Sequence, residues 1–335
     1  MTDKTLDDIE PVDPLILALA PGEWLSGTYL SKILGITRSA VSARIARLRE
    51  IGVDIYAVSG KGYRLAHPVD PLDSAVVDQQ LSKSAAETLD CLIVRQIVDS
   101  TNTLVGGYRD GMTRAALAEC QTAGRGRGGR PWVSPYASNL YLSIGYELVA
   151  PRAPIATVSL AAGVAVAEAL SALGIADIGL KWPNDLWIGR DKIGGILTEA
   201  RAEAGGGAHI VVGLGLNIAM PKNQATTIDQ PWTRLIDHWP EARSRSVVAG
   251  RCLDAIINAL VEFEHDGFSP FVARWTRFDR VIGREIDLVD DTRRRTGTAR
   301  GIGEDGRLIV TIDGHDEAIY SGDISLRLAS SRAVV

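Results

Sequence analysis

The apolar positions near the start of the chain recur with the period of an α-helix. They predict three helices, at residues 14–20, at residues 28–34 and from Thr37 or Arg38 onward. In the third helix Val41, Ile45 and Leu48 are spaced so that they share one buried face. Gly35 separates the second helix from the third, and two helices joined by a short turn with glycine are typical of a helix-turn-helix.

A short apolar hairpin follows these helices, at residues 53–58 and 63–65, and its turn carries Lys61 between two glycines. A basic hairpin directly after a helix-turn-helix is the pattern of a winged helix. We therefore assign residues 1–66 to a winged helix-turn-helix domain. Residues 67–72, with Pro68 and Pro71, are predicted to be the linker that leads into the next domain.

Strand-like and helical stretches alternate through residues 67–279, which is typical of one mixed α/β sheet domain. We expect strands at residues 92–98, 115–120, 139–146, 178–181, 193–200 and 209–216, and helices from Ser100 or Thr101 to 108, at 154–173 and at 247–264. The helix at 154–173 is rich in alanine but contains Ser159 and Glu168. It is predicted to be a buried helix rather than a membrane span.

Residues 280–335 form the third predicted domain and contain short strands separated by turn residues. The strands are expected at residues 285–289, 295–302, 308–312, 317–320 and 324–328, with turns at 304–306 and 313–315. A small β-barrel is the simplest way to close such a sheet, because it leaves little open edge. The whole chain is therefore predicted to be α+β.

Charge is segregated along the chain. The 335 residues include 36 Lys and Arg against 41 Asp and Glu, and this net charge of −5 argues against a protein that coats nucleic acid. Residues 26–66, however, hold seven basic and two acidic residues and carry +5, which leaves −10 on the rest. This local patch is compatible with site-specific DNA binding.

Small and basic residues lie on the third helix opposite its buried face, where they suit a DNA major groove. The residues predicted to contact DNA are Arg38, Ser39, Ser42, Ala43, Arg47 and, from the hairpin turn, Lys61. Arg38 and Lys61 would hold phosphates. The alternative is a small helical protein-binding domain with a solvated basic face.

The three cysteines, Cys91, Cys120 and Cys252, are scattered and lack the spacing of metal ligands. Neither a disulfide framework nor a zinc cluster is expected. The first ten residues are acidic and do not have the basic and apolar segments of a signal peptide. We therefore predict a protein of the reducing cytoplasm with no membrane partner.

A run of glycine and arginine at residues 124–132 carries the strongest chemical signal. It contains Arg125, Arg127 and Arg130 and no acid, and it lies between two predicted strands. Glycine lets backbone N–H groups approach an anion, and arginine grips phosphate or carboxylate with two parallel hydrogen bonds. Trp132 offers a flat face for a nucleotide base. Disordered RNA-binding arms have similar runs, but in polar tails, so an anion-binding loop is favoured.

Two lysines stand at the ends of predicted strands. Lys181 opens the sequence KWPND, which is either a tight surface turn or the place where a fixed positive charge enters a site. Lys192 opens the next strand and precedes a pair of glycines. Upstream, the sequence DSTN at residues 99–102 makes a helix N-terminus, which is a natural place for polar groups of a ligand.

The motifs DSTN, QTAGRGRGGRPW, NLYLS, KWPND, DKIGGIL and GLGLN follow one another in this order, and with them the chain resembles the biotin protein ligases. With a winged helix in front and GDISLR near the end, nearly the whole chain resembles the bifunctional ligases that also repress the biotin operon. The resemblance implies a catalytic sheet similar to that of class II aminoacyl-tRNA synthetases and a C-terminal SH3-like β-barrel.

The resemblance also implies a reaction in two steps. The carboxylate of biotin attacks the α-phosphate of MgATP, which gives biotinyl-5′-AMP and pyrophosphate. A lysine of a biotin carboxyl carrier protein domain, as in acetyl-CoA carboxylase, then attacks the anhydride and AMP leaves. Positive charge must stand between the two anions of the first step. Lys181, Arg125 and Arg127 match the positions that supply it.

Ligand contacts are assigned by the same resemblance. Biotin is expected to contact Ser100, Thr101, Asn102, Gln121, Gly124, Arg125, Gly126, Arg127 and Lys192. ATP is expected to contact Arg127, Arg130, Trp132, Lys181, Asn184, Lys192, Asn217 and Arg327, with its adenine on Trp132. No carboxylate cage is visible in the sequence, so no protein metal ligands are predicted and Mg²⁺ is expected on the substrate phosphates and water.

Regulation follows from the same family. A loop rich in glycine loses much entropy when it becomes ordered, and biotinyl-5′-AMP would order it. The resemblance implies that this intermediate is the corepressor and favours a homodimer through the central sheets. Such a dimer presents two winged helices to a palindromic operator DNA.

Other functions remain open at this point. A lipoate ligase relative would share the fold and the adenylation chemistry, but without the Gly/Arg motif in this form. A pure biotin sensor would have a decayed ligase site, whereas Lys181, Arg125 and Arg127 are intact. A ligase whose winged helix no longer binds DNA is compatible with everything in the sequence.

Overall fold

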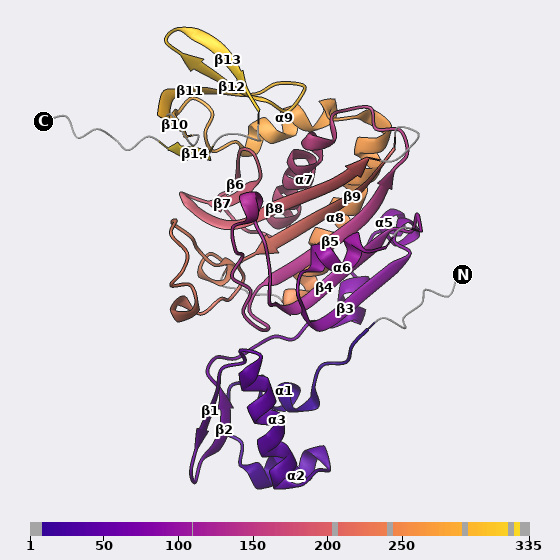
Figure 1. Ribbon diagram of the computed structural model, residues 1–335, viewed down its shortest axis with the longest axis vertical. Helices are drawn as coiled ribbons and strands as arrows, with labels where there is room; N and C mark the ends of the chain where they lie inside the picture. The colour runs from indigo at the N-terminus through magenta and orange to yellow at the C-terminus, as the bar shows by residue number, and fades with distance from the viewer. Residues whose placement is uncertain are drawn as a thin grey trace, which may run out of the picture.

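The computed structural model describes residues 9–108, 110–202, 207–239, 244–289, 294–320 and 325–328. Figure 1 shows three parts along its long axis. The N-terminal helices and hairpin lie at one end, a large sheet with its helices lies in the middle, and the C-terminal strands lie at the other end. This combination of helical and strand-rich parts confirms the predicted α+β class.

The N-terminal part consists of α1 (Pro14–Leu19), α2 (Gly27–Leu34), α3 (Arg38–Glu50), β1 (Ile55–Val58) and β2 (Gly62–Leu65). Side chains of Ser26 and Thr37 cap α2 and α3 by accepting hydrogen bonds from backbone N–H groups. Gly35 ends α2 with a φ of 65°. The helix-turn-helix is thus confirmed. Strand β1 starts later than predicted, because the Val53 N–H donates a hydrogen bond to the Leu48 carbonyl and so still belongs to the C-terminal end of α3.

The described residues of the middle part form a seven-stranded sheet in the order β3-β4-β5-β9-β8-β7-β6. Its strands are β3 (Cys91–Val98), β4 (Arg114–Gln121), β5 (Leu140–Leu148), β6 (Ile178–Lys181), β7 (Asp185–Ile188), β8 (Asp191–Ala202) and β9 (Ala208–Leu216). Strands β3 and β4 are parallel, and the other described neighbours are antiparallel. The sheet is therefore mixed, as predicted.

Strand β7 is absent from the sequence-based expectation. Pro183, Asn184 and Asp185 are turn-forming residues, and they indicate a turn without showing that a strand follows at once. In the structure β6 and β7 make a tight hairpin in which Lys181 pairs with Asp185. The hairpin matters for function because it places Lys181 at the end of β6 opposite Asp185 of β7.

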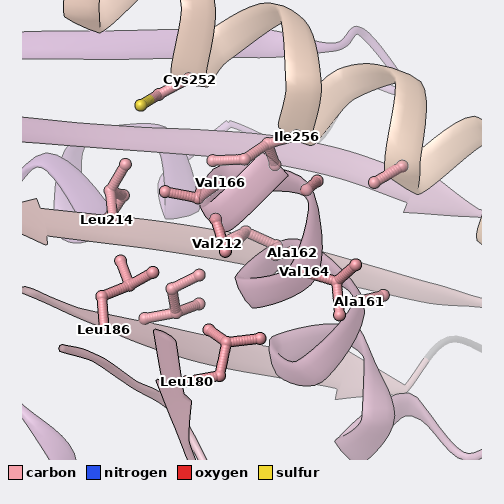
Figure 2. Packing of buried hydrophobic residues seen from close by; sticks show 14 of the residues in the cluster. Ala161, Ala162, Val164, Val166, Leu180, Leu186, Val212, Leu214, Cys252 and Ile256 are labelled. Atoms are coloured by element: carbon pink, nitrogen blue, oxygen red, sulfur yellow. The ribbon is translucent and has the colours of Figure 1, made fainter. Parts of the chain in front are cut away.

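Helices cover one face of the sheet. Figure 2 shows Val166 of α7 (Val158–Ala172) between Leu214 of β9 and Ile256 of α8 (Arg245–Asp266). By length and composition α7 passes for a membrane span, but most of it is buried inside the protein, in the core position predicted. Helix α9 (Ser269–Phe278), which the sequence pattern missed, packs beside α7. Two short helices, α4 (Ser74–Asp78) and α5 (Lys83–Thr88), pack on α8.

The opposite face of the sheet carries α6 (Thr101–Gly106). Val105 of this helix clusters with Ala116 of β4 and Val211 of β9. Their strand neighbours Leu117 and Val212 belong instead to the main core under α7 and α8. Because side chains alternate between the faces of a strand, α6 must lie across the sheet from the long helices.

The C-terminal part is an antiparallel sheet of β10 (Glu285–Val289), β11 (Arg294–Ile302), β12 (Leu308–Ile312), β13 (His315–Ile319) and β14 (Ser325–Leu328). Strand β13 starts earlier than predicted, because Asp313 and Gly314 both have positive φ and make a two-residue turn. The indole N–H of Trp182 donates to the Gly306 carbonyl at 3.0 Å and ties this sheet to the β6–β7 hairpin. Residue 324, predicted to begin the last strand, lies outside the described residues.

A buried ion pair joins the linker to the interior of the middle part. Glu119 on β4 is 0% exposed and Arg245 on α8 is 3% exposed, and 2.7 Å separates Glu119 Oε2 from Arg245 Nη2. The other carboxylate oxygen accepts from Leu72 N–H at 2.6 Å. Each buried charge therefore depends on its partner for compensation.

Replacing Arg245 with alanine is expected to lower the free energy of unfolding by about 3–5 kcal/mol, because the Glu119 carboxylate stays buried without a cation. Urea unfolding followed by tryptophan fluorescence measures the effect. Arg295→Ala is the control, since Arg295 pairs with Glu317 at a partly exposed site where water screens both charges, and it should change stability by less than about 1 kcal/mol. Equal unfolding midpoints for the two variants would contradict this assignment.

Candidate functional site

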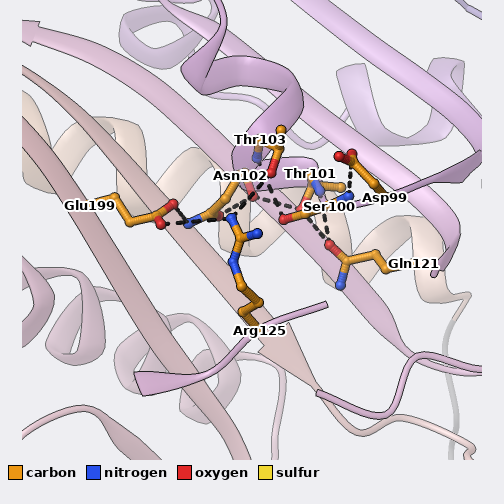
Figure 3. Close-up of polar contacts among 9 residues, drawn as sticks. Asp99, Ser100, Thr101, Asn102, Thr103, Gln121, Arg125 and Glu199 are labelled. Atoms are coloured by element: carbon orange, nitrogen blue, oxygen red, sulfur yellow. Dashed lines mark hydrogen bonds and ion pairs between the residues drawn. The ribbon is translucent and has the colours of Figure 1, made fainter. Parts of the chain in front are cut away.

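The first turn of α6 forms one end of the candidate site, as Figure 3 shows. Gln121 at the end of β4 accepts hydrogen bonds from Thr101 N–H at 2.9 Å and from its hydroxyl at 3.1 Å. Ser100 caps the helix, and both Ser100 and Thr101 are buried. The structure thus brings three predicted biotin contacts together as neutral donors and acceptors, which suit an uncharged polar group.

Asn102 occupies the centre of a polar cluster beneath the same turn (Figure 3). Its Nδ2 donates to Glu199 Oε2 at 2.8 Å, and its Oδ1 accepts from the Ser143 hydroxyl at 2.6 Å. The backbone of β9 makes room for it, since a Cβ added to Gly213 would lie 2.1 Å from Asn102 Oδ1. Gly213, the first glycine of GLGLN, must therefore lack a side chain for Asn102 to keep this position.

The Gly/Arg loop folds back over this end of the sheet. Gly126 N–H donates to the Arg130 carbonyl at 2.7 Å, and Trp132 N–H donates to the Gly124 carbonyl at 2.8 Å. Arg125 reaches from the loop to the α6 turn, where its Nη2 lies 3.2 Å from Thr103 Oγ1 and 3.9 Å from Glu199 Oε1. Arg125 consequently connects the loop to the helix turn and to β8.

Gly124 has no room for a side chain. A Cβ there would lie 2.8 Å from Ser134 Oγ and 2.9 Å from Gln121 Nε2. A half-open hollow of about 650 Å³ lies between α6, β8 and β9, and Arg125 is the loop residue that lines it. The loop backbone therefore approaches the site closely, as the glycines predict.

The indole of Trp132 lies against the backbone of β9. A Cβ added to Gly215 would lie 2.5 Å from Trp132 Cε2, and the Lys192 ammonium lies 5.7 Å from the centre of the indole. The indole Nε1 is buried and has no hydrogen-bond partner among the described residues. This ring is held in place by packing against β9.

Cationic groups gather beside Trp132 around one carboxylate. Lys192 Nζ lies 2.7 Å from Asp185 Oδ1, and both side chains are mostly buried. The Lys181 ammonium lies 4.7 Å from the centre of the Trp187 ring, on the neighbouring strand. Asp185 lies opposite Lys181 in the β6–β7 hairpin. The two lysines predicted from separate motifs are thus linked through one hairpin.

Arg127 is partly buried near the same carboxylate. Burial lowers the pKa of its guanidinium, the negative charge of Asp185 raises it, and the positive charge of Arg130 lowers it again. Arginine stays charged over the physiological range, so the cations of the site outnumber its carboxylates Asp185 and Glu199. Such a site suits a ligand with several negative charges.

Three other predicted nucleotide contacts, Asn184, Asn217 and Arg327, are not part of this group of cations. The side chain of Asn184 donates to the Ile196 carbonyl at 2.7 Å and connects the hairpin to β8. Asn217 is buried next to Asn139, with 3.5 Å between Asn139 Nδ2 and Asn217 Oδ1. The backbone of Arg327 pairs with Asp287 in the C-terminal sheet, but its side chain lies outside the described residues. Their roles toward ATP stay predictions.

The predicted DNA-contacting residues form one exposed surface. Arg38, Ser39, Ser42, Ala43 and Arg47 are all exposed on α3, opposite the buried Val41, Ile45 and Leu48. Lys61 is exposed at the hairpin tip, 5.9 Å from the centre of the Trp24 ring. The geometry agrees with a helix presented to a groove and a hairpin presented to phosphates.

Sequence reasoning missed three residues that the site uses. Asp185 pairs with Lys192, Glu199 binds Asn102, and Ser143 bonds to both Thr101 and Asn102. Asp185 and Ser143 lie inside KWPND and NLYLS, so the motifs contained the information. Glu199 lies on β8 outside the quoted motifs, and only the pairing of β8 with β9 brings it to Asn102.

Replacing Gly215 with alanine is expected to raise the KM for ATP by about tenfold, because the new methyl group displaces the Trp132 ring. The fold should survive, since overpacking costs about 1–3 kcal/mol and the loop can yield. Initial rates of pyrophosphate release against ATP concentration measure this effect. Gly27→Ala is the control, since its backbone is not left-handed and the atom nearest to the new methyl is 3.4 Å away. An unchanged KM for Gly215→Ala would count against the role of Trp132.

Comparisons with known proteins identify the family of this chain. The sequence profile of the Biotin/lipoate A/B protein ligase family matches residues 93–217, an HTH domain profile matches residues 15–64, and the Biotin protein ligase C terminal domain profile matches residues 281–327. The bifunctional ligase/repressor BirA of Salmonella typhimurium is 38% identical over 319 residues, which cover 94% of this chain and 97% of the relative.

Other relatives lead to the same family. The bifunctional ligase/repressor BirA of Escherichia coli is 36% identical over 94% of this chain and 97% of its own length. Among solved structures, the biotin protein ligase from Aquifex aeolicus in complex with biotin and ATP superposes with a TM-score of 0.62 at 28% identity. It covers 71% of this chain and 99% of its own chain.

Proposed function

This chain belongs to the biotin protein ligase family, as a bifunctional ligase and repressor, and we propose that its site activates biotin with ATP and passes it to a lysine of a biotin carboxyl carrier protein domain. The observation that carries the proposal is that Arg125 of the Gly/Arg loop reaches the α6 turn. Neutral partners gather at this turn, which forms the neutral end of the site, and cations gather along the loop and the β6–β7 hairpin, which form its cationic end.

Biotin would place its ureido ring at the neutral end. Ser100, Thr101, Asn102 and Gln121 offer both donors and acceptors there. The loop residues Gly124, Arg125, Gly126 and Arg127 would close over the ligand. The hydrogen bond that Arg125 donates to Thr103 supports this placement, because it joins the loop to the helix turn.

The nucleotide would lie at the cationic end. Its adenine would stack on Trp132, and its phosphates would face Arg127, Arg130, Lys181 and Lys192. In the first step an oxygen of the biotin carboxylate forms a bond to the α-phosphorus while the bond to pyrophosphate breaks. Both reactants are anions, so the attack requires cations fixed beside them, and cations that are already held by the fold cost no reorganisation.

Lys192 is held for this role by its ion pair with Asp185. In the second step a neutral lysine amine of the carrier attacks the biotinyl carbonyl, and AMP leaves with the bonding electrons. The negative charge that develops on the AMP phosphate faces the same cations. One set of residues can thus assist both steps.

Mg²⁺ would enter with the ATP phosphates and neutralise charge on the pyrophosphate. Across the described ranges, no group of three or more His, Cys, Asp or Glu side chains is arranged to hold a metal ion. The residues that would face the nucleotide are cations together with the carboxylate of Asp185, a set that suits a phosphate-bound ion better than a protein-bound one.

The repressor role belongs to the winged helix, and we infer that it depends on the ligase site. Biotinyl-5′-AMP would act as corepressor by ordering the Gly/Arg loop and favouring a homodimer. The dimer would bring two copies of α3 to operator DNA. The work of this protein would take place in the cytoplasm, where ATP, carrier and DNA are available.

Incubation of the chain with biotin, ATP, Mg²⁺ and a biotin carboxyl carrier domain tests the enzyme. The carrier is expected to gain the mass of one biotin less one water, as read by mass spectrometry. A parallel reaction with lipoate and a lipoyl domain tests the related activity. Mass gain with lipoate and none with biotin would overturn the assignment.

A further inference from the structure

Three consecutive residues at the end of β4 contact three different parts of the chain. Glu119 binds the linker through Leu72 N–H, and Gln121 binds Thr101 in the candidate biotin site. Between them, Cys120 is buried in the same apolar cluster as Leu15 of the winged helix. One short strand segment therefore touches the linker, the DNA-binding part and the ligand site.

The base of the Gly/Arg loop lies against the same segment. Tyr136 is four residues beyond Trp132, and its ring belongs to the apolar cluster of the winged helix. Ala137 has a φ of 51°, a left-handed conformation that is costly for a residue with a Cβ. Its N–H donates to the Glu119 carbonyl at 2.9 Å. Packing and this hydrogen bond hold the strained backbone in place.

A chain of hydrogen bonds runs from the loop base to the N-terminal arm. The Tyr136 hydroxyl donates to Gln96 Oε1, and Gln96 N–H donates to Glu10 Oε2 at 2.8 Å. Glu10 N–H donates in turn to the Val94 carbonyl at 2.9 Å. The arm that leads into α1 is thus attached to the sheet beside Tyr136.

The linker that follows the winged helix is attached both to α1 and to α8. Val69 N–H donates to the Ala20 carbonyl at 3.0 Å, directly after α1. Asp70 Oδ2 accepts from Arg245 N–H at the start of α8 at 2.5 Å. The winged helix is therefore attached to the middle part by both its entry and its exit, and both attachments lead to residues 119–137.

We propose that residues 119–121 and 136–137 form a joint that couples ordering of the Gly/Arg loop to the position of the winged helix, with Tyr136 as the positioning residue. The inference rests on the proposed function and deepens its regulatory part. A ligand that orders the loop fixes residues 132–137, and a fixed Tyr136 restrains both the apolar cluster and the Gln96–Glu10 contact. The element with two arrangements is the loop, and the ligand and the winged helix both bias it.

Hydrogen exchange measured by mass spectrometry tests the joint in the full chain. Biotin and ATP are expected to slow exchange on the order of tenfold at Glu10, Val69 and Leu72, because local opening at the joint becomes rarer. The same sample is assayed for biotin transfer to the carrier domain. Unchanged exchange at these amides in a chain that transfers biotin would overturn the joint and leave the proposed function standing.

Tyr136→Phe separates positioning from simple stability, because it removes only the hydroxyl. This variant is expected to transfer biotin at the normal rate and to keep its melting temperature within a few degrees. The slowing of exchange at Glu10 should shrink from about tenfold to about twofold. Tyr146→Phe is the matched control, since Tyr146 is equally buried and its hydroxyl bonds to Glu264 at 2.7 Å, away from the winged helix.

The control variant should show the full slowing. Equal slowing in Tyr136→Phe and Tyr146→Phe would overturn the role of Tyr136. Absence of biotin transfer by the unchanged chain would overturn the proposed function and the joint with it. The two failures are thus told apart by the transfer assay.

Discussion

Lys181→Ala is expected to slow formation of biotinyl-5′-AMP by about 10²- to 10³-fold, the usual effect of removing one fixed group that stabilises developing charge. Lys181 ends β6 opposite Asp185, and its ammonium is held 4.7 Å from the centre of the Trp187 ring. Its side chain is only partly buried, so its loss leaves the hydrophobic core intact. Pyrophosphate release in the presence of biotin and MgATP measures the first step without the carrier.

The expected loss must be separated from a loss of structure. Arg190→Ala removes an exposed cation from the turn between β7 and β8 and is expected to leave pyrophosphate release unchanged. The melting temperatures of both variants should lie close to that of the unchanged chain. Near-normal pyrophosphate release by Lys181→Ala would remove this residue from the catalytic group.

Arg127→Gly should accelerate dissociation of biotinyl-5′-AMP by about 10- to 100-fold, which corresponds to one lost hydrogen bond between charged groups. Arg127 is partly buried on the loop, where Asp185 acts on its charge. A loop without this cation would hold the phosphate of the intermediate less well. Displacement of labelled biotinyl-5′-AMP by an excess of unlabelled biotin measures the rate.

Escape of the reactive anhydride has a second, visible consequence. The leaked intermediate acylates lysines of unrelated proteins, so labelled biotin should appear on a bystander such as serum albumin. Arg190→Gly makes the same chemical change at an exposed turn and should leave the bystander unlabelled. Retention of the intermediate by Arg127→Gly at the normal rate would contradict a clamping role for the loop.

The local pattern of the sequence is sufficient for the winged helix. Val41, Ile45 and Leu48 repeat at the period of a helix, and all three are buried in α3. The caps Ser26 and Thr37 and the break at Gly35 lie next to the residues that they serve. Such features can be predicted from the sequence because the residues that interact lie within a few positions of each other along the chain.

The hairpin of β6 and β7 is an element that the local sequence pattern does not predict. Turn residues at 183–185 mark a reversal, but they do not tell whether a strand resumes at once. Pairing of Asp185 with Gly195 on β8 decides this, and it depends on the sheet order. The two motifs KWPND and DKIGGIL therefore identified Lys181 and Lys192, but not the pairing of Asp185 with Lys192 that links Lys192 to the hairpin.

The sequence by itself determined the periodic elements, the separation of +5 from −10, and the residue types of the Gly/Arg loop. Only the tertiary structure decided which of these residues meet. Asn102 donates a hydrogen bond to Glu199, which is 97 positions further along the chain, and the Trp132 ring packs on Gly215 of β9. Hydrophobic periodicity reports which face of an element is buried, whereas the partners in a site are set by strand order and close packing, which no local pattern encodes.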